Sequence, residues 1–176
     1  AVNEGCNHLM FNLSHAYVLG GGARIDTAGS DCSIDVALEQ GAVPDGGLEK
    51  LGAGTLSLLQ DNDYTGPTVV TNGTLRLTSA TCLSSDTTVY LYTGAVCDLD
   101  FAGTQAVQAL YKNGVVQPNG THGTTASGAT YPDDVLFSGN GVLQVGAVTT
   151  TTVAPTTTTV APTPTTTTTC TGPAVY

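Results

Sequence analysis

A glycine-opened run of alternating polar and apolar residues recurs along this chain at a spacing of about 20 residues. It reads Gly54-Thr55-Leu56-Ser57-Leu58 and then Gly73-Thr74-Leu75-Arg76-Leu77, and residues 94–99 and 141–145 repeat the shape. Alternation with a period of two residues predicts a strand with one buried face. Strands that recur at a short, fixed interval predict a solenoid, because one coil cannot bury its apolar face alone and stacked coils share a core.

Other short runs alternate in the same way, and each places its apolar residues on one predicted face. They are Cys32, Ile34, Val36 and Leu38; Cys97, Leu99 and Phe101; and Leu9, Phe11 and Leu13, with Asn12 outside. Turn signals such as Asn72-Gly73 and Asn113-Gly114 separate the runs. No helical stripe is long enough to stand alone, so the sequence predicts an all-β fold.

Charged residues are scarce, and the only bases are Arg24, Lys50, Arg76 and Lys112, which leaves a formal net charge of −10. A nucleic-acid surface needs a basic footprint that displaces counterions from phosphate, and four scattered bases do not supply one. No run approaches the roughly 18 apolar residues that a spanning helix needs. We therefore expect no nucleic acid among the partners and no membrane insertion.

The segment around the first recurring run begins Gly46-Gly47-Leu48-Glu49-Lys50-Leu51-Gly52 and continues through Asp63-Tyr64-Thr65-Gly66-Pro67 to Gly73-Thr74-Leu75. This stretch resembles the signature of the autotransporter-associated β-strand repeat. Residues 110–121 and 137–143 resemble the closing segment of bacterial surface proteins that carry such repeats. The resemblance implies a right-handed parallel β-helix on or outside a bacterial cell, with no catalytic residues to carry over. The chain departs from large members in having only one full repeat.

We therefore expect a right-handed parallel β-helix, or β-solenoid, over residues 21–148. Residues 1–20 are expected to form an N-terminal cap or an inter-subunit strand. Residues 149–176 form a Thr/Pro-rich tail that cannot build a core. The tail is either a disordered linker or an extended mucin-like stalk with O-linked sugars. The candidate O-glycosylation sites are Thr149, Thr150, Thr151, Thr152, Thr156, Thr157, Thr158, Thr159, Thr163, Thr165, Thr166, Thr167, Thr168 and Thr169.

Several features predict an extracellular or cell-surface location. The chain begins at Ala1 without an apolar leader, so we expect that a signal peptide has been removed. Three sequons make Asn12, Asn72 and Asn119 candidates for N-glycosylation. Five cysteines are disulfide candidates, and an odd number leaves at least one free or bonded to another chain. They are Cys6, Cys32, Cys82, Cys97 and Cys170. The alternative is that some are buried thiols.

No catalytic constellation or cofactor motif is present. The histidines His8, His15 and His122 lack metal-ligand spacing and are expected at the surface or in turns. No nucleophile elbow frames a serine. Two acidic pairs could bind calcium through carboxylate oxygens, although solvated turn acids are the ordinary alternative. These pairs are Asp61 with Asp63 and Asp133 with Asp134.

The sequence favours a self-assembling fibril subunit that associates head to tail, because a short solenoid has two open ends. In that hypothesis the tail carries Cys170 toward Cys6 of another copy. The alternative is a monomeric adhesin or carbohydrate-binding module on a stalk, with surface glycans as partners. A remote alternative is a polysaccharide-acting enzyme, which would need a groove lined with tyrosines such as Tyr90, Tyr92 or Tyr131. Intramolecular caps on the solenoid ends favour the monomer, and bare ends favour the fibril.

Overall fold

The computed structural model of this chain describes residues 7–146. In it, these residues form 18 short strands. No helix occurs in these residues. The first coil holds β1 (His8–Met10), β2 (Ala16–Val18) and β3 (Ala23–Asp26), and the second holds β4 (Cys32–Ile34), β5 (Leu38–Gln40) and β6 (Leu48–Leu51). The third holds β7 (Thr55–Leu58) and β8 (Thr68–Val70), the fourth β9 (Gly73–Leu77) and β10 (Thr88–Leu91), and the fifth β11 (Ala95–Leu99), β12 (Thr104–Val107) and β13 (Ala109–Lys112). The last strands are β14 (Val115–Val116), β15 (Gly120–Gly123), β16 (Tyr131–Pro132), β17 (Phe137–Gly139) and β18 (Val142–Val145).

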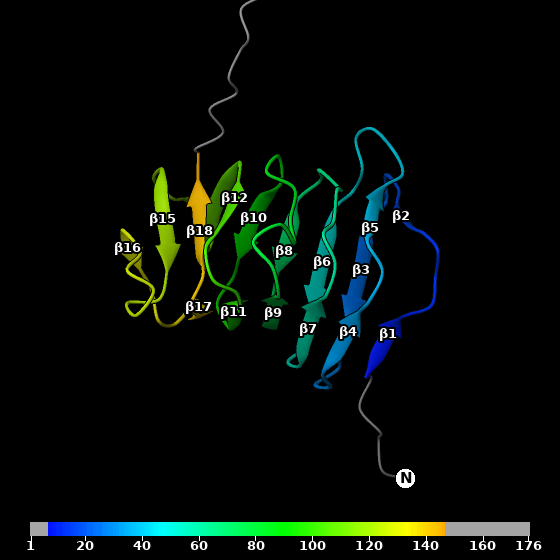
Figure 1. Cartoon of the computed structure of the whole chain (residues 1–176), viewed down its shortest axis with the longest axis horizontal. Helices are drawn as coiled ribbons and strands as arrows, with labels where there is room; N and C mark the ends of the chain where they lie inside the picture. The colour runs from blue at the N-terminus through cyan, green and yellow to red at the C-terminus, as the bar shows by residue number, and fades with distance from the viewer. Residues whose placement is uncertain (1–6, 147–176) are drawn as a thin grey trace, which may run out of the picture.

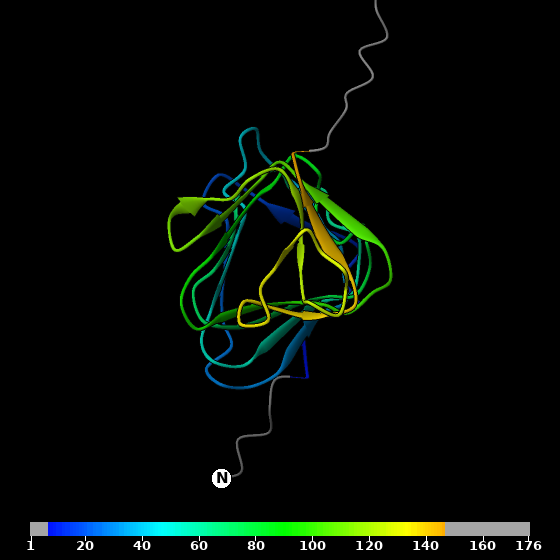
Figure 2. The ribbon, with the colours of Figure 1, turned by 90° about the vertical axis from the view of Figure 1, so that its left-hand side faces the viewer.

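The coils stack into a parallel β-solenoid of about five turns (Figure 1). The first sheet runs β1-β4-β7-β9-β11-β17, and every pair in it is parallel. The second sheet runs β3-β6-β8-β10-β13-β14, and a third face holds β2-β5 and β12-β18-β15-β16. Viewed along the stack, the coils surround one core (Figure 2). The predicted all-β parallel solenoid is confirmed.

Side-chain amides take the place of strands on the third face between β5 and β12. Asn62 Oδ1 accepts a hydrogen bond from the backbone N–H of Leu38 at 2.8 Å, and Asn62 Nδ2 donates to the carbonyl of Cys82 at 2.6 Å. Gln105 accepts from the N–H of Leu83 at 3.0 Å and donates to its carbonyl at 2.8 Å. Buried backbone groups need partners, so these two amides keep the third face hydrogen-bonded where strands are missing.

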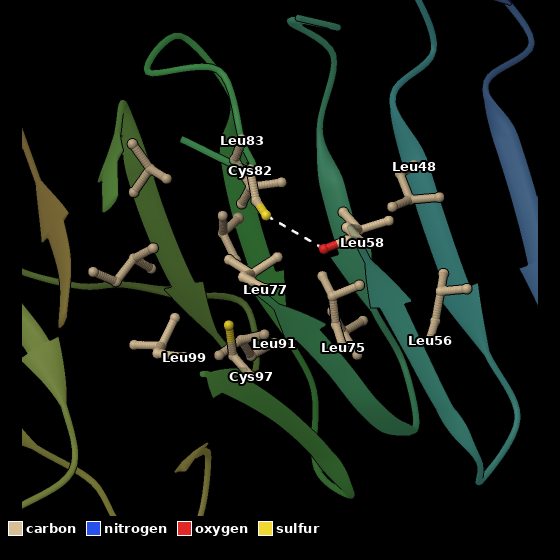
Figure 3. Close-up of a cluster of buried hydrophobic side chains, with 14 of the residues drawn as sticks. Leu48, Leu56, Leu58, Leu75, Leu77, Cys82, Leu83, Leu91, Cys97 and Leu99 are labelled. Atoms are coloured by element: carbon tan, nitrogen blue, oxygen red, sulfur yellow. Dashed lines mark hydrogen bonds between the residues drawn. The ribbon is translucent and has the colours of Figure 1, made fainter. Parts of the chain in front are cut away.

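The core consists of columns of inward side chains that lie in register between coils. Two columns run along the first sheet: Cys32, Leu56, Leu75, Cys97 and Phe137; and Ile34, Leu58, Leu77 and Leu99. All these residues are buried, and Figure 3 shows the middle of both columns. Each buried leucine contributes about 2 kcal/mol through the area it removes from water. Residues 141–145 repeat the sequence shape but form β18 on the third face, so the glycine-opened pattern alone does not assign a strand to a sheet.

The two ends of the described solenoid differ. At the C-terminal end, β14 folds back antiparallel on β13, and β15 lies antiparallel on β18. At the other end, β1, β2 and β3 are the outermost described strands of their faces. β1 and β2 fall inside the segment expected to be a cap or an inter-subunit strand, and they pair with β4 and β5 of the same chain.

The predicted apolar face of Leu9, Phe11 and Leu13 is wrong. β1 ends at Met10, and all three side chains are exposed. Asn12 has a φ of 55°, and this left-handed conformation interrupts the alternation. In contrast, the predicted inward face from Cys32 to Leu38 is confirmed, since its four apolar side chains are buried.

Candidate functional site

The repeat-like segment places a buried lysine at the corner where successive coils meet. Lys50 is fully buried at an inward position of β6, in register with Ile25 and Val70. Its Nζ donates to the carbonyls of Gly52 at 2.8 Å, Leu51 at 2.9 Å and Asn72 at 3.1 Å, and lies 3.1 Å from Thr27 Oγ1. Burial lowers the pKa of Lys50, and the charge of Asp26 opposes this shift. The ammonium therefore joins three coils and is not presented to solvent.

A buried carboxylate organises the neighbouring corner. Asp45 Oδ1 accepts from the N–H groups of Gly47 at 2.9 Å and Gly66 at 2.8 Å. Its Oδ2 accepts from the Thr65 N–H at 2.8 Å, the Thr65 hydroxyl at 3.2 Å and Gln40 Nε2 at 3.1 Å. Burial raises the pKa of Asp45, but the hydrogen bonds from Thr65, Gln40 and the two glycines outweigh it and leave the pKa below its usual value. Like Lys50, Asp45 holds the fold together.

The outer face of the second sheet carries an aromatic ladder. Val89 and Leu91 are buried, so the predicted alternation of β10 is confirmed. Tyr90 stacks on Tyr111 with ring centroids 4.8 Å apart and an interplanar angle of 14°. Sugars stack on the electron-rich face of a ring, and here each tyrosine covers a face of the other. The ladder therefore stabilises the sheet.

The tyrosines named for a sugar-binding groove do not share one strand. Tyr90 belongs to the second sheet, Tyr92 follows that strand in a corner, and Tyr131 belongs to β16 on the third face. Residues 7–146 enclose no pocket.

His122 lies in β15 at the capped end, where the sequence predicted a surface or turn histidine. That prediction is wrong, since the residue is fully buried and stacks on Tyr131 with centroids 5.0 Å apart. Nε2 donates to the carbonyl of Pro118 at 3.0 Å, whereas the buried Nδ1 has no hydrogen-bond partner among the described residues. Burial lowers the pKa of His122; the nearby Lys112 acts in the same direction, while Pro118 and Asp133 oppose it.

We predict that His122 makes the cap sensitive to mild acid. The unfolded chain takes up a proton near the ordinary histidine pKa of 6.5, while the folded state resists protonation at Nδ1. Stability is therefore complete above that pH and falls as the pH drops through it toward the lower folded-state pKa. Urea unfolding of His122→Phe should show a smaller loss of stability between neutral and mildly acidic pH than the wild type. The exposed His15→Phe serves as control, and an equal loss in all three proteins would refute the assignment.

The calcium candidates do not converge. Asp61 accepts from the hydroxyls of Ser79 and Thr81, and Asp63 accepts from the N–H of Gln40. Asp133 pairs with Lys112 Nζ at 2.9 Å, whereas Asp134 accepts from the N–H and hydroxyl of Thr125. Within residues 7–146, no group of three or more His, Cys, Asp or Glu side chains is placed to hold a metal ion. Calcium binding by these residues stays a prediction.

The candidate modification sites are exposed where the structure describes them. Asn12, Asn72 and Asn119 are all exposed. Cys82 and Cys97 are buried free thiols, and burial raises the pKa of Cys97 to about 12. Cys6, Cys170 and the threonine-rich tail lie outside the described residues. Glycosylation and a disulfide among the other cysteines stay predictions.

The comparisons with known proteins agree with the fold. A family model described as passenger-associated-transport-repeat matches residues 48–77. The Adhesin BmaC autotransporter of Brucella suis biovar 1 (strain 1330) is 33% identical over 136 residues, which are 76% of this chain and 4% of that protein. This chain thus spans a small fraction of the curated relative's length. No solved structure matches. Within residues 7–146, no helix is long and apolar enough to cross a membrane. The chain is a parallel β-solenoid that carries an autotransporter-associated repeat.

Proposed function

We propose that this chain is a non-enzymatic, adhesin-like passenger segment that displays a rigid β-solenoid at the bacterial surface or outside the cell. The observation that carries the proposal is the similarity to an autotransporter adhesin over 136 residues of this chain. The single stack of coils that residues 7–146 form is consistent with it. The buried charges support it, because Lys50 and Asp45 bond to backbone groups at coil corners. Such residues build a scaffold and leave binding to the outward faces.

Surface labelling tests the location, and bead attachment tests the adhesive role. Antibodies raised against the purified chain should label intact cells of the source bacterium, and permeabilisation should add little signal. Beads coated with the chain should attach to host-cell monolayers more than beads coated with albumin. Beads coated with heat-denatured chain are the matched control for the folded surface. Labelling only after permeabilisation would reject the location, and equal attachment of native and denatured beads would reject the adhesive role.

A head-to-tail fibril is the second candidate. Among residues 7–146, strands β1, β2 and β3 have a partner on one side only, which is the arrangement that a head-to-tail contact would extend. The antiparallel strands β14 and β15 weigh against this geometry, because they lie at the end where the next subunit would stack. Electron microscopy of the native protein without reducing agent separates the two candidates. Regular fibrils would support the fibril hypothesis. Dispersed particles would reject it and favour the passenger segment.

A further inference from the structure

Four asparagines in this chain are each followed by glycine, a pairing in which the asparagine side chain can lose its amide. They are Asn72, Asn113, Asn119 and Asn140. In this reaction the backbone nitrogen of the glycine attacks the side-chain carbonyl carbon of the asparagine, and glycine has no side chain to hinder the approach. The local sequence therefore makes the four pairs equivalent, whereas their positions in the fold differ.

Three of the pairs are held by contacts between strands or coils. The Gly73 N–H donates to the carbonyl of Gly94 on the next coil at 3.0 Å, and the Gly141 N–H donates to the carbonyl of Leu99 at 3.0 Å. Gly120 lies in β15, which pairs antiparallel with β18. At these positions the backbone must leave its partners before the glycine nitrogen can attack.

The fourth pair, Asn113 and Gly114, forms the two-residue turn between β13 and β14. Lys112 and Val115 are register partners on either side of it. The φ angles of 50° at Asn113 and 79° at Gly114 fit a hairpin turn in which both central residues are left-handed. Within residues 7–146, the Gly114 N–H has no hydrogen-bond acceptor, and a side chain at Gly114 would meet nothing within 4 Å. The attacking nitrogen of this pair is therefore unhindered.

Little packing resists the backbone rotation that brings the Gly114 nitrogen to the Asn113 side chain. β14 consists of Val115 and Val116, whose side chains are 63% and 60% exposed. A segment that buries so little opens locally at a low cost in free energy. The Thr93 hydroxyl donates to Asn113 Oδ1 at 2.9 Å, and a donor at this oxygen stabilises the negative charge that develops there during the attack.

We propose that Asn113 is a site of spontaneous deamidation, which the fold selects from the four asparagine–glycine pairs. The Gly114 nitrogen forms a bond to Cγ of Asn113 while the Cγ–Nδ2 bond breaks. The leaving amino group takes up the proton of the Gly114 N–H and departs as ammonia. Water then opens the resulting cyclic imide at either carbonyl, which yields aspartate or isoaspartate. Both products add a negative charge to the capped end, and isoaspartate also lengthens the main chain of the turn.

Peptide mapping by mass spectrometry tests this proposal on the full chain, aged in a mildly alkaline buffer. The protein is kept reduced and is produced in a host that adds no N-linked sugars, since Asn72 and Asn119 lie in sequons. In the folded protein, Asn113 should deamidate at least about tenfold faster than each of the other three asparagines. In guanidinium chloride the four rates should become similar. Similar rates in the folded protein, a faster rate at another pair, or a preference for Asn113 that persists after unfolding would each overturn the proposal.

An isoaspartyl methyltransferase, which labels isoaspartate, gives a second readout on variants. Asn113→Gly accepts the left-handed turn and should remove most of the label that the aged wild type acquires. The matched control Asn140→Gly changes another asparagine of the same kind and should keep the label. Full labelling of aged Asn113→Gly, or an equal loss in both variants, would show that the isoaspartate forms elsewhere and would overturn the assignment.

Discussion

Lys50→Met should strongly destabilise the solenoid. The variant keeps the apolar stem but removes the ammonium that donates to the carbonyls of Leu51, Gly52 and Asn72. Hydrogen bonds to a charged group are worth about 1.5–3 kcal/mol each, and buried acceptors left without donors add a desolvation penalty. We expect a loss of about 3 kcal/mol or more in the free energy of unfolding, which corresponds to a Tm lower by roughly 10 °C.

Thermal and urea unfolding measured by circular dichroism check this expectation. The control is Arg24→Met, which removes a base from the adjacent strand β3, where the Arg24 side chain is 70% exposed and pairs with Glu49. Exposed ion pairs contribute about 0–1 kcal/mol, so the control should unfold close to the wild type. Equal stability of Lys50→Met and Arg24→Met would show that the buried ammonium is dispensable.

Asp45→Asn is the second change with a large expected effect. The amide keeps the shape of the carboxylate but has one acceptor oxygen, so donors among Gly47, Gly66, Thr65 and Gln40 lose their partner. We expect a loss of about 3 kcal/mol at neutral pH. Asp86→Asn, at an exposed position, should change the stability little.

The pH dependence separates loss of charge from loss of packing at Asp45. Hydrogen bonds hold the folded-state pKa of this carboxyl below its ordinary value of 3.8. The carboxylate therefore contributes its full stability above that pH, and the contribution falls as the pH drops toward the lower folded-state pKa. The difference in unfolding free energy between wild type and Asp45→Asn should shrink below about pH 4. A difference that is constant with pH would mean that the variant fails for steric reasons.

The sequence predicts the repeating part of the fold because that part follows a simple rule. Leu56 and Leu75 each follow the glycine that opens their run by two residues, and the structure places them directly in register. The same rule fails at Leu9, Phe11 and Leu13. The pairing of β1 with β4 is irregular between His8 and Met10, and the backbone turns left-handed at Asn12 after the strand has ended. The alternation of the sequence signals neither feature.

The buried polar residues could not be predicted from the sequence. A lysine in an alternating strand is expected to reach solvent, and only the meeting of three coil corners gives Lys50 enough acceptors to be buried. Asn62 and Gln105 look like loop residues, yet each bonds to backbone that lies 20 or more residues away. His122 is buried only because β15 folds back on β18, a long-range pairing that local pattern does not encode.

On the third face, the side chains of Asn62 and Gln105 supply hydrogen bonds where strands are missing, and this determines where the coils can vary in length. In the first sheet, 24 residues separate Cys32 from its register partner Leu56, 19 separate Leu56 from Leu75, and 22 separate Leu75 from Cys97. The two continuous sheets keep their register despite these differences, so the third face absorbs them. Insertions and deletions are therefore tolerated along one flank of the rod, and sequence can diversify there while the helical pitch of the scaffold is preserved.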